Sequence, residues 1–371
     1  MNGRRSLLRT VGAASVLGVP TAGCLGGDGG PPTVLGTYPG PDLSKPATYR
    51  PFERWLDRRH AVLLSFFEAE VPRRRGDAAV AHQLTAAWDA GAVPLLTWEP
   101  FLGAPSGPSA DESSDGSPTP VTSRIADGEV DALLDRWGAL LAAWLDADGD
   151  RRLYFRPMHE MNGDWYPWGV GSGATPEAYV AAWRRLRTAM RGAGVPDDRM
   201  RWVWCPNATD AGGAPATAFY PGDGAVDWVG VDGFNFGDSR AWSGWRWPEE
   251  VFGDALSRLR GLTDLPVAVP EVATSSVRGG GHDPRAKSRW IRRAFDVFDA
   301  RDVALACWFN VDKETDWAVF GGARGTATYT DDGTSYRVYR AYREAAASPD
   351  VVGAEAAASP RNSRDAFAGR F

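Results

Sequence analysis

Two glutamates, Glu160 and Glu271, are the residues whose types and positions are best suited to acid–base chemistry. Apolar runs that predict buried strands lead into them: Leu153–His159 precedes Glu160, and Pro266–Glu271 ends at Glu271. In a parallel barrel, polar residues at the carboxyl ends of strands meet at one mouth. Two carboxyl groups ~5–5.5 Å apart can cleave a glycosidic bond with retention of configuration, one as proton donor and the other as nucleophile. We expect that separation here, but position alone does not assign the two roles.

The elements that must position these glutamates alternate between short apolar runs and amphipathic stretches, which predicts parallel strands covered by helices. We predict eight strands: Thr33–Tyr38, Ala61–Phe67, Val93–Trp98, Leu153–His159, Met200–Pro206, Asp227–Phe234, Pro266–Glu271 and Ala304–Asn310. The predicted helices are Pro46–Arg59, Ala78–Ala90, Asp127–Asp146, Pro176–Ala193, Pro248–Gly261, Asp283–Ala300 and Ser335–Ala346, with a weaker one somewhere in Ala208–Gly224.

Eight such units over residues 33–347 predict an α/β fold, a single (β/α)8 TIM barrel, because this fold needs ~250 residues. A doubly wound sheet is the alternative. Long irregular segments follow strands three, five and six, at Phe101–Arg124, Asn207–Ala225 and Gly237–Pro248, where they would shape a substrate site. Residues 348–371 are rich in Ala, Ser, Pro and Arg without periodicity, so we expect a disordered tail.

One motif is more specific than the strand pattern. The stretch from Arg156 to Gly169, RPMHEMNGDWYPWG, strongly resembles the acid/base motif of glycoside hydrolase family 26, whose best-known members are β-mannanases. The resemblance extends over most of residues 33–345, through Thr97–Pro100, Pro221–Asn235, Pro270-Glu271 and Trp308-Phe309. It implies a retaining barrel enzyme with Glu160 as general acid/base and Glu271 as nucleophile.

The resemblance also implies a set of substrate-binding neighbours. His159 would hold the sugar just before the scissile bond, and Trp165 and Trp308 would flank it. Residues at strand ends add Trp98, Glu99 and Asp232, the last two as hydrogen-bond partners of substrate hydroxyls. Arg156 lies four residues before Glu160, and we predict both on the same strand face, where the cation would orient a carboxylate and keep the nucleophile ionised. An ordinary ion pair inside the barrel is the alternative for Arg156.

One departure from the family pattern concerns the strand that carries Asp232. A tyrosine that hydrogen-bonds the nucleophile is common there, but this chain has Asp232-Gly233-Phe234. Loss of that donor would cause a modest decrease in rate. The resemblance implies an endo-β-1,4-mannanase. Because of the missing tyrosine, mixed-linkage β-glucan and β-1,3-xylan stay open as alternative substrates, and exo action stays open as well. A surface protein that binds carbohydrate without cleaving it is the alternative of another class.

Composition restricts the partners. The chain of 371 residues has 41 Lys and Arg against 47 Asp and Glu, a net charge of −6, with no basic stripe, so we expect no nucleic-acid partner. Its 17 tryptophans suggest a saccharide site, although some, such as Trp55, Trp88 and Trp137, lie in helical patterns typical of core packing. Four His and two Cys beyond Cys24 form no zinc pattern and no disulfide framework, so Cys205 and Cys307 are expected to be buried thiols. We expect no cofactor or metal and a monomer.

The first 24 residues resemble an export signal. Arg4-Arg5 precede an apolar run from Val11 to Pro20, which is too short to span a membrane, and Thr21-Ala22-Gly23-Cys24 resembles a lipobox. We therefore expect an exported protein anchored to the membrane by a lipid on Cys24, with residues 25–32 as a flexible spacer. Plain secretory cleavage near Ala22 is the alternative.

Overall fold

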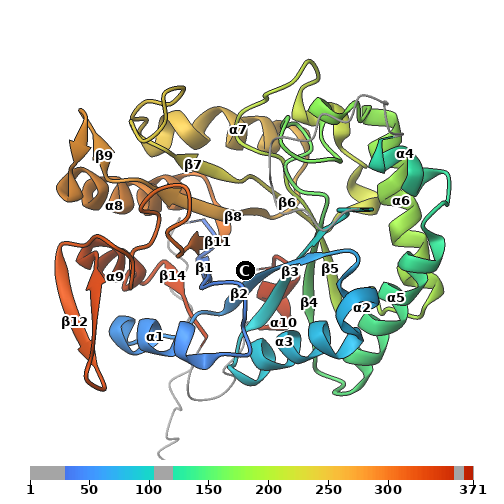
Figure 1. Ribbon diagram of the computed structural model, residues 1–371, viewed down its shortest axis with the longest axis horizontal. Coiled ribbons are helices and arrows are strands. Elements are labelled where there is room, and N and C mark those ends of the chain that lie inside the picture. Colours follow the sequence, from blue (N-terminus) through green and yellow to red (C-terminus); the bar gives the residue numbers. More distant parts are fainter. Residues whose placement is uncertain (1–29, 104–119, 355–362, 371) are drawn as a thin grey trace, which may run out of the picture.

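The computed structural model describes residues 30–103, 120–354 and 363–370. Their centre is a closed parallel barrel in which each strand pairs with the next and the last pairs with the first (Figure 1). The barrel strands are β1 (Thr33–Tyr38), β2 (Val62–Glu68), β3 (Val93–Glu99), β4 (Leu153–Pro157), β5 (Met200–Trp204), β6 (Trp228–Gly230), β8 (Val267–Thr274) and β11 (Val303–Phe309). The predicted eight-stranded barrel is confirmed, and the doubly wound sheet is excluded.

Helices surround the barrel. They are α1 (Arg50–Leu56), α2 (Val71–Arg75), α3 (Asp77–Asp89), α4 (Val121–Ala126), α5 (Asp131–Asp146), α6 (Pro176–Gly192), α7 (Pro248–Leu262), α8 (Pro284–Ala300), α9 (Arg340–Ala346) and α10 (Arg364–Phe367). Local signals fix several of their starts. Thr175 and Asp283 cap α6 and α8 by accepting hydrogen bonds from the backbone N–H groups of Ala178 and Ala286, and each cap is followed by proline.

Two predicted elements differ from the structure. No α-helix forms between Ala208 and Gly224, where the chain makes only the short 3-10 turns Ala216–Phe219 and Asp223–Ala225. The stretch predicted as a helix from Ser335 begins as the hairpin of β12 (Ala327–Asp331) and β13 (Thr334–Val338), and the helix starts only at Arg340. Asp332-Gly333 is the signal for that hairpin, because both residues adopt the positive φ that its tight turn needs.

Short strands complete the fold. β7 (Gly233–Asn235) follows β6 and pairs with a later part of β8, since Gly230 lies opposite Ala268 and Gly233 opposite Val272. The others are β9 (Val277–Arg278), β10 (Gly281–His282) and β14 (Val351–Val352), which pairs with β1. None of the described helices is long and apolar enough to cross a membrane.

The expected disordered tail is wrong in part. β14 and α10 both lie within it, and the side chain of Phe367 is 1% exposed. The Phe367 ring lies 4.8 Å from the Tyr154 ring, and its carbonyl accepts a hydrogen bond from the indole of Trp228. The tail is therefore attached to the barrel by the pairing of β14 with β1 and by the buried ring of Phe367. The export signal and most of the segment after β3 lie outside the described residues.

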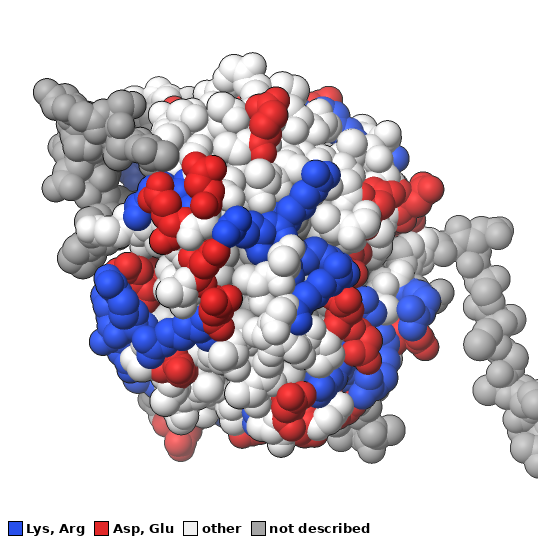
Figure 2. All heavy atoms as spheres, turned by 90° about the vertical axis from the view of Figure 1, so that its right-hand side faces the viewer, with Lys and Arg blue, Asp and Glu red and all other residues white. Residues whose placement is uncertain are grey.

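The tryptophans are mostly core residues. Eleven of the 17 are less than 2% exposed, Trp88 and Trp137 among them, and Trp55 is 3% exposed. On the surface over α4, α5 and α6, acidic and basic side chains are intermixed (Figure 2). The two internal cysteines are buried free thiols, as predicted. The tryptophan content thus reflects packing between barrel and helices more than a sugar site.

Candidate active site

The backbone after β4 places Glu160. The strand ends at Pro157, two residues earlier than predicted, and both Met158 and Glu160 adopt a left-handed conformation with φ of 51° and 53°. This conformation is unfavourable for non-glycine residues and is found mainly where the surrounding structure enforces it. Here the Met158 N–H donates to the carbonyl of Trp98 (3.0 Å), and the Glu160 N–H donates to that of Cys205 (2.8 Å). Glu160 therefore lies in a segment after β4 whose backbone is hydrogen-bonded to the ends of β3 and β5. The prediction that it shares a strand face with Arg156 is wrong.

Arg156 bonds two carboxylates of the site, those of Glu271 and Asp232. Its side chain is fully buried, and Nη2 donates to Oε1 of Glu271 at 2.6 Å. Nη1 bonds both oxygens of Asp232, at 2.8 and 2.7 Å, and Nε donates to Oγ1 of Thr97 at 2.9 Å. The guanidinium thus holds the Glu271 carboxylate in one orientation and compensates its charge. Its expected place in the substrate-binding set is corrected, because every nitrogen already has a protein partner.

The same contacts correct the expectation for Asp232. This residue is fully buried and both of its oxygens accept from Arg156, so it is not placed to bond a substrate hydroxyl. The position of Asp232 at the end of a strand correctly predicts which end of the barrel it occupies. It does not predict that the carboxylate is buried below the surface of the site. Asp232 instead fixes the guanidinium that contacts Glu271.

Glu160 has two donors that the motif alone did not pair with it. The amide of Asn207, which follows β5, donates to Oε1 at 2.7 Å, and the indole of Trp165 donates to Oε2 at 2.8 Å. Asn162 in turn accepts from the Asn207 backbone N–H (2.8 Å) and donates to the carboxylate of Asp210 (2.8 Å), which joins the loops after β4 and β5. Neither Asn207 nor Asn162 is among the site residues predicted from the sequence. For Asn207 a signal was available, because it is a polar residue directly after the predicted strand Met200–Pro206.

The two glutamates have different electrostatic surroundings. The pKa of Glu160 is raised to about 7, first because burial removes water from the charged form and second because Glu271 is negative. Burial also raises the pKa of Glu271, but the charge and the hydrogen bond of Arg156 oppose the increase. The arrangement favours a protonated Glu160 beside an ionised Glu271 near neutral pH.

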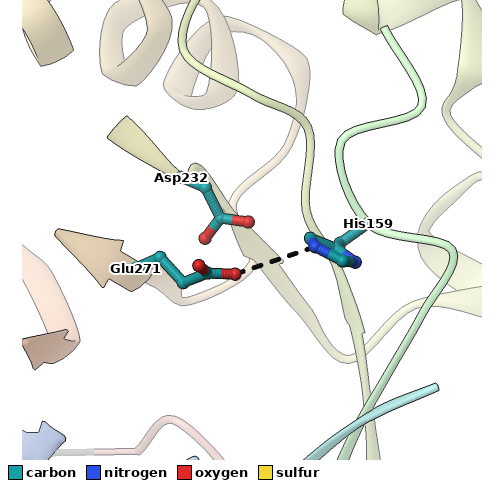
Figure 3. A group of neighbouring side chains, drawn as sticks. All are labelled: His159, Asp232 and Glu271. Atoms are coloured by element: carbon teal, nitrogen blue, oxygen red, sulfur yellow. Dashed lines mark ion pairs between the residues drawn. The ribbon is translucent and has the colours of Figure 1, made fainter. Parts of the chain in front are cut away.

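His159 and Asp232 approach Glu271 from the other strand ends (Figure 3). The His159 Nε2 atom lies 3.8 Å from Oε1 of Glu271, and burial followed by the charge of Arg156 keeps the pKa of the imidazole well below its usual value. One potential ligand atom from each of the three residues lies within 4.8 Å of the others, a spacing that a metal ion could use. However, Arg156 bonds both carboxylates, so a cation already occupies this position and we assign no metal here.

Glu99, the last residue of β3, is partly buried and close enough to Glu271 and Arg156 for their charges to act on its carboxyl group. Its pKa is raised to about 8, mostly by burial, with a smaller contribution from the charge of Glu271 and an opposing one from Arg156. A protonated carboxyl group can donate a hydrogen bond as well as accept one. Its contact with a substrate stays a prediction.

The predicted substrate contacts of Trp98 and Trp308 are wrong. Neighbouring residues in a strand point to opposite faces, and Thr97 faces inward to Arg156, so Trp98 faces outward and is fully buried. Trp308 is 1% exposed, and its ring lies 6.2 Å from that of Trp290 in α8 and 5.3 Å from that of Tyr342 in α9. Both indoles belong to the layer between barrel and helices.

Other aromatic residues do lie at the site. Trp165 is 44% exposed beside Glu160, whereas Trp168 is buried and stacks on Tyr166 with ring centroids 4.4 Å apart. Phe234, where the family pattern commonly has tyrosine, is partly exposed and contacts the ring of Phe309 at 5.8 Å. Phe234 has no hydroxyl to donate, so Arg156 is the donor that the structure gives to Glu271.

The fold and the site define a class: a TIM barrel whose mouth carries two glutamates in contrasting environments, one of them bound by a buried arginine. Residues 121–247 match the model of glycosyl hydrolase family 26. The chain is 30% identical over 253 residues to Endoglucanase H of Acetivibrio thermocellus, covering 66% of this chain and 25% of that protein. It is 32% identical over 133 residues to a mannan endo-1,4-β-mannosidase of Bacillus subtilis strain 168, covering 34% of this chain and 31% of that protein.

Solved structures show the same fold. The catalytic domain of a family 26 endo-β-1,4-mannanase from Bacillus sp. JAMB-750 superposes with a TM-score of 0.62 at 18% identity, covering 87% of each chain. A family 26 protein, GH26C, from Muricauda sp. MAR_2010_75 gives 0.64 at 16% identity, covering 89% of each. Together, these comparisons support the assignment of the chain to glycosyl hydrolase family 26. The chain spans about a quarter to a third of the length of these two curated relatives.

Proposed function

We propose that this protein is a retaining glycoside hydrolase that cleaves β-linked polysaccharide, with β-1,4-mannan as its substrate. The observation that carries the proposal is the contrast between the two glutamates. Glu160 has a pKa of about 7 and is bonded by Asn207 and Trp165, and Glu271 is bonded by Arg156. A retaining enzyme needs this division between a protonated acid and an ionised nucleophile.

The proposed reaction has two steps. Glu271 attacks the anomeric carbon while Glu160 transfers its proton to the leaving glycosidic oxygen, which gives a covalent glycosyl-enzyme. Glu160, now ionised, then takes a proton from water, and the resulting hydroxide displaces Glu271 with a second inversion. Arg156 stays bound to Glu271 and balances its returning charge. This mechanism expects the two carboxyl groups ~5–5.5 Å apart, and a separation of ~6.5–9.5 Å would indicate inversion instead.

A second substrate is favoured by a separate observation. The match to Endoglucanase H extends over 66% of this chain, about twice the 34% matched by the mannanase of Bacillus subtilis strain 168. We therefore keep a mixed-linkage β-glucan as the alternative substrate of the same two glutamates, with β-1,3-xylan as a third polymer to test.

The test is release of reducing sugar from β-mannan, lichenan and β-1,3-xylan by the wild type and by Glu160→Ala, Glu271→Ala and Glu249→Ala. Glu249 lies exposed on α7 and serves as the matched control. We expect release from β-mannan, a loss of about three orders of magnitude or more with Glu271→Ala, and no loss with Glu249→Ala. Release from lichenan alone would shift the substrate to β-glucan. Binding without any release would leave a carbohydrate-binding protein.

Azide separates the two roles. An aryl glycoside with a good leaving group needs no proton, so Glu160→Ala should still form the glycosyl-enzyme, and added azide should yield a β-glycosyl azide. Glu271→Ala lacks the nucleophile and should yield the α-glycosyl azide by direct displacement. The reverse pairing of anomers, or wild-type rates in either variant, would overturn the assignment.

A further inference from the structure

Trp242 is the most exposed large apolar side chain among the described residues, at 73%. It lies between β7 and α7, in a segment that starts at the carboxyl end of a barrel strand and therefore on the side of the active site. A single exposed indole needs no explanation by itself. Trp242 differs because it ends a row of rings that leads back to the active site.

We call Phe309, Phe234, Phe236 and Trp242 the aromatic row. Successive ring centroids along it are 5.8, 6.3 and 4.8 Å apart. Phe234 and Phe236 are both partly exposed, and Phe309 contacts Tyr38 at 4.7 Å. The negative charge of Glu271 helps to raise the pKa of Tyr38. Tyr38 also contacts Phe66 at 5.0 Å, and Phe66 contacts His159 at 5.9 Å, the residue next to Glu271. The row thus starts at the aromatic residues that surround the active site and ends at the surface.

The segment that carries Trp242 is fixed at both ends. Oδ1 of Asn235 accepts hydrogen bonds from the backbone N–H groups of Gly237 (3.2 Å) and Arg246 (3.0 Å). Gly237 has φ of +55°, and a Cβ there would lie 2.2 Å from the carbonyl oxygen of Val277, so only glycine fits this turn. None of these contacts involves the Trp242 side chain. Its removal should leave the segment in place.

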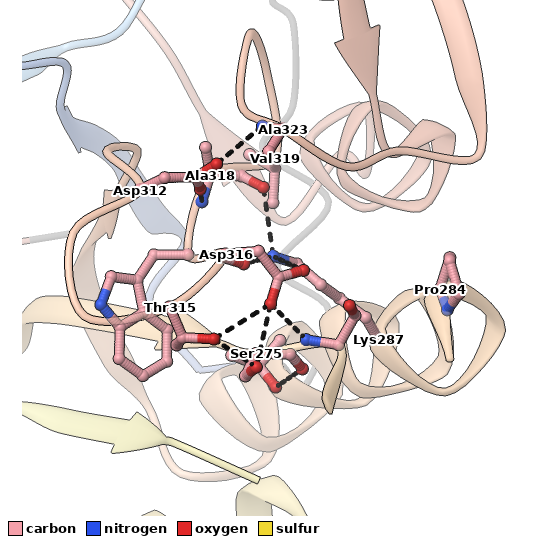
Figure 4. Close-up of polar contacts among 12 residues, drawn as sticks. Ser275, Pro284, Lys287, Asp312, Thr315, Asp316, Ala318, Val319 and Ala323 are labelled. Carbon is pink, nitrogen blue, oxygen red and sulfur yellow. Dashed lines mark hydrogen bonds and ion pairs between the residues drawn. The ribbon is translucent and has the colours of Figure 1, made fainter. Parts of the chain in front are cut away.

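The aromatic row also packs against a buried tryptophan, Trp317. Trp317 is 1% exposed and lies 4.7 Å from Phe236 and 5.3 Å from Phe234. Its loop is held by the buried Lys287, whose ammonium donates to the carbonyls of Asp316 and Ala318 (Figure 4). A surface held in this way loses little conformational entropy when it binds a ligand.

We propose that Trp242 is a sugar-binding platform for a distal unit of the same β-glycan chain that is cleaved between Glu160 and Glu271. This inference rests on the proposed function and extends it. The apolar C–H face of a pyranose can lie on an indole ring, and the partly exposed Phe234 and Phe236 provide an apolar path between that ring and the active site. The platform contributes only to substrates long enough to reach it.

The experiment compares wild type, Trp242→Ala and Trp242→Tyr on the polymer hydrolysed by the wild type and on its oligosaccharides from three to six units. We expect Trp242→Ala to raise KM by about tenfold on the polymer and the longest oligosaccharides, with kcat unchanged. The trisaccharide should be cleaved as by the wild type, and Trp242→Tyr should recover most of the loss because it keeps an aromatic face. Equal constants at every length would overturn the proposal, and so would an equal loss at every length, which would indicate an effect on the active site itself.

Affinity electrophoresis in gels containing each polymer separates failure of this inference from failure of the proposed function. If the wild type is retarded by a polymer that it does not hydrolyse, catalysis fails while the platform is still tested by Trp242→Ala, which should migrate faster. Unchanged retardation of Trp242→Ala would overturn the platform alone. A wild type that neither binds nor hydrolyses any of the three polymers would remove both proposals.

Discussion

Glu160 and Glu271 have the same side chain and differ only in what contacts them. Two neutral donors, an amide and an indole, bond Glu160, whereas a guanidinium bonds Glu271. A full positive charge stabilises a carboxylate more than neutral donors do, so burial raises the pKa of Glu160 with less opposition. The proposed acid and the proposed nucleophile are therefore distinguished by Arg156 more than by their own positions.

This contrast predicts the pH dependence of activity. Glu160 must be protonated to act as the acid, so kcat/KM should fall as pH rises through about 7, the pKa of Glu160. At low pH, kcat/KM should fall again when Glu271 becomes protonated. The measurement is kcat/KM from pH 4 to pH 10 on a substrate with a poor leaving group. Constant activity up to pH 9 would contradict the assignment.

A substitution of Asn207 tests the same pH dependence of kcat/KM. Its amide stabilises the charged form of Glu160, so Asn207→Ala should raise the pKa of Glu160 and move the alkaline limb to higher pH. The acidic limb belongs to Glu271 and should move much less. A purely structural effect of the substitution would lower activity without shifting the limb.

At the level of elements, the loop between β11 and β12 is joined to α8 by the buried Lys287. Its ammonium donates to the carbonyl oxygens of Asp316 and Ala318, and burial lowers its pKa to about 8. The Asp316 carboxylate also accepts hydrogen bonds from Ser275 at 2.9 Å and from the backbone of Ser276 at 2.9 Å, which joins the loop to the end of β8. Lys287 and Asp316 together thus connect this loop to α8 and to the end of β8.

Replacing Lys287 with methionine should destabilise the protein. Lys287→Met keeps the chain length but leaves buried carbonyl groups and the Asp316 carboxylate without their cationic partner, which should lower the free energy of unfolding by about 2–4 kcal/mol. Urea unfolding measures it. The control is Lys313→Met on the same loop, where the side chain is 55% exposed, with an expected change of less than about 0.5 kcal/mol. An unchanged midpoint for Lys287→Met would show that the lysine does not support the loop.

At the level of the whole molecule, one end of the barrel carries the two glutamates, and the other end binds the C-terminal tail. The carboxyl ends of the strands carry the acidic site, and Phe367 packs against Tyr154 at the start of β4. The tail therefore lies at the end of the barrel away from the two glutamates. This separation is typical of TIM barrels, in which one end provides chemistry and the other stability.

We propose that the protein is exported and anchored by a lipid on Cys24, as residues 1–24 predict. Cells grown with a labelled fatty acid should label the wild type but not Cys24→Ala. The other two cysteines are buried in the folded protein, so a label cannot be explained by Cys205 or Cys307, and Cys205→Ala should keep it. Equal labelling of wild type and Cys24→Ala would exclude the lipid anchor.

The sequence alone determined the eight strands, most of the helices and the two glutamates, because apolar periodicity and strand ends are local properties of the chain. Through the motif around Glu160, it also indicated glycosyl hydrolase family 26, which the comparisons support. Only the tertiary structure decided which side chains reach the site. Trp98 and Trp308 lie beside predicted site residues in the chain but face the helices, because neighbouring residues of a strand point in opposite directions.

The burial of the site residues and their hydrogen-bond partners were likewise decided by the tertiary structure. Asp232 ends a strand as predicted, yet Arg156, from a strand distant in the sequence, takes up both of its oxygens. Asn207 donates to Glu160 across the loops after β4 and β5, which Asn162 joins by accepting from the Asn207 backbone. The composition of the tail predicts disorder, but β14 pairs with β1 and the Phe367 ring is buried against Tyr154. Such contacts depend on the barrel closing, and no local pattern in the sequence encodes them.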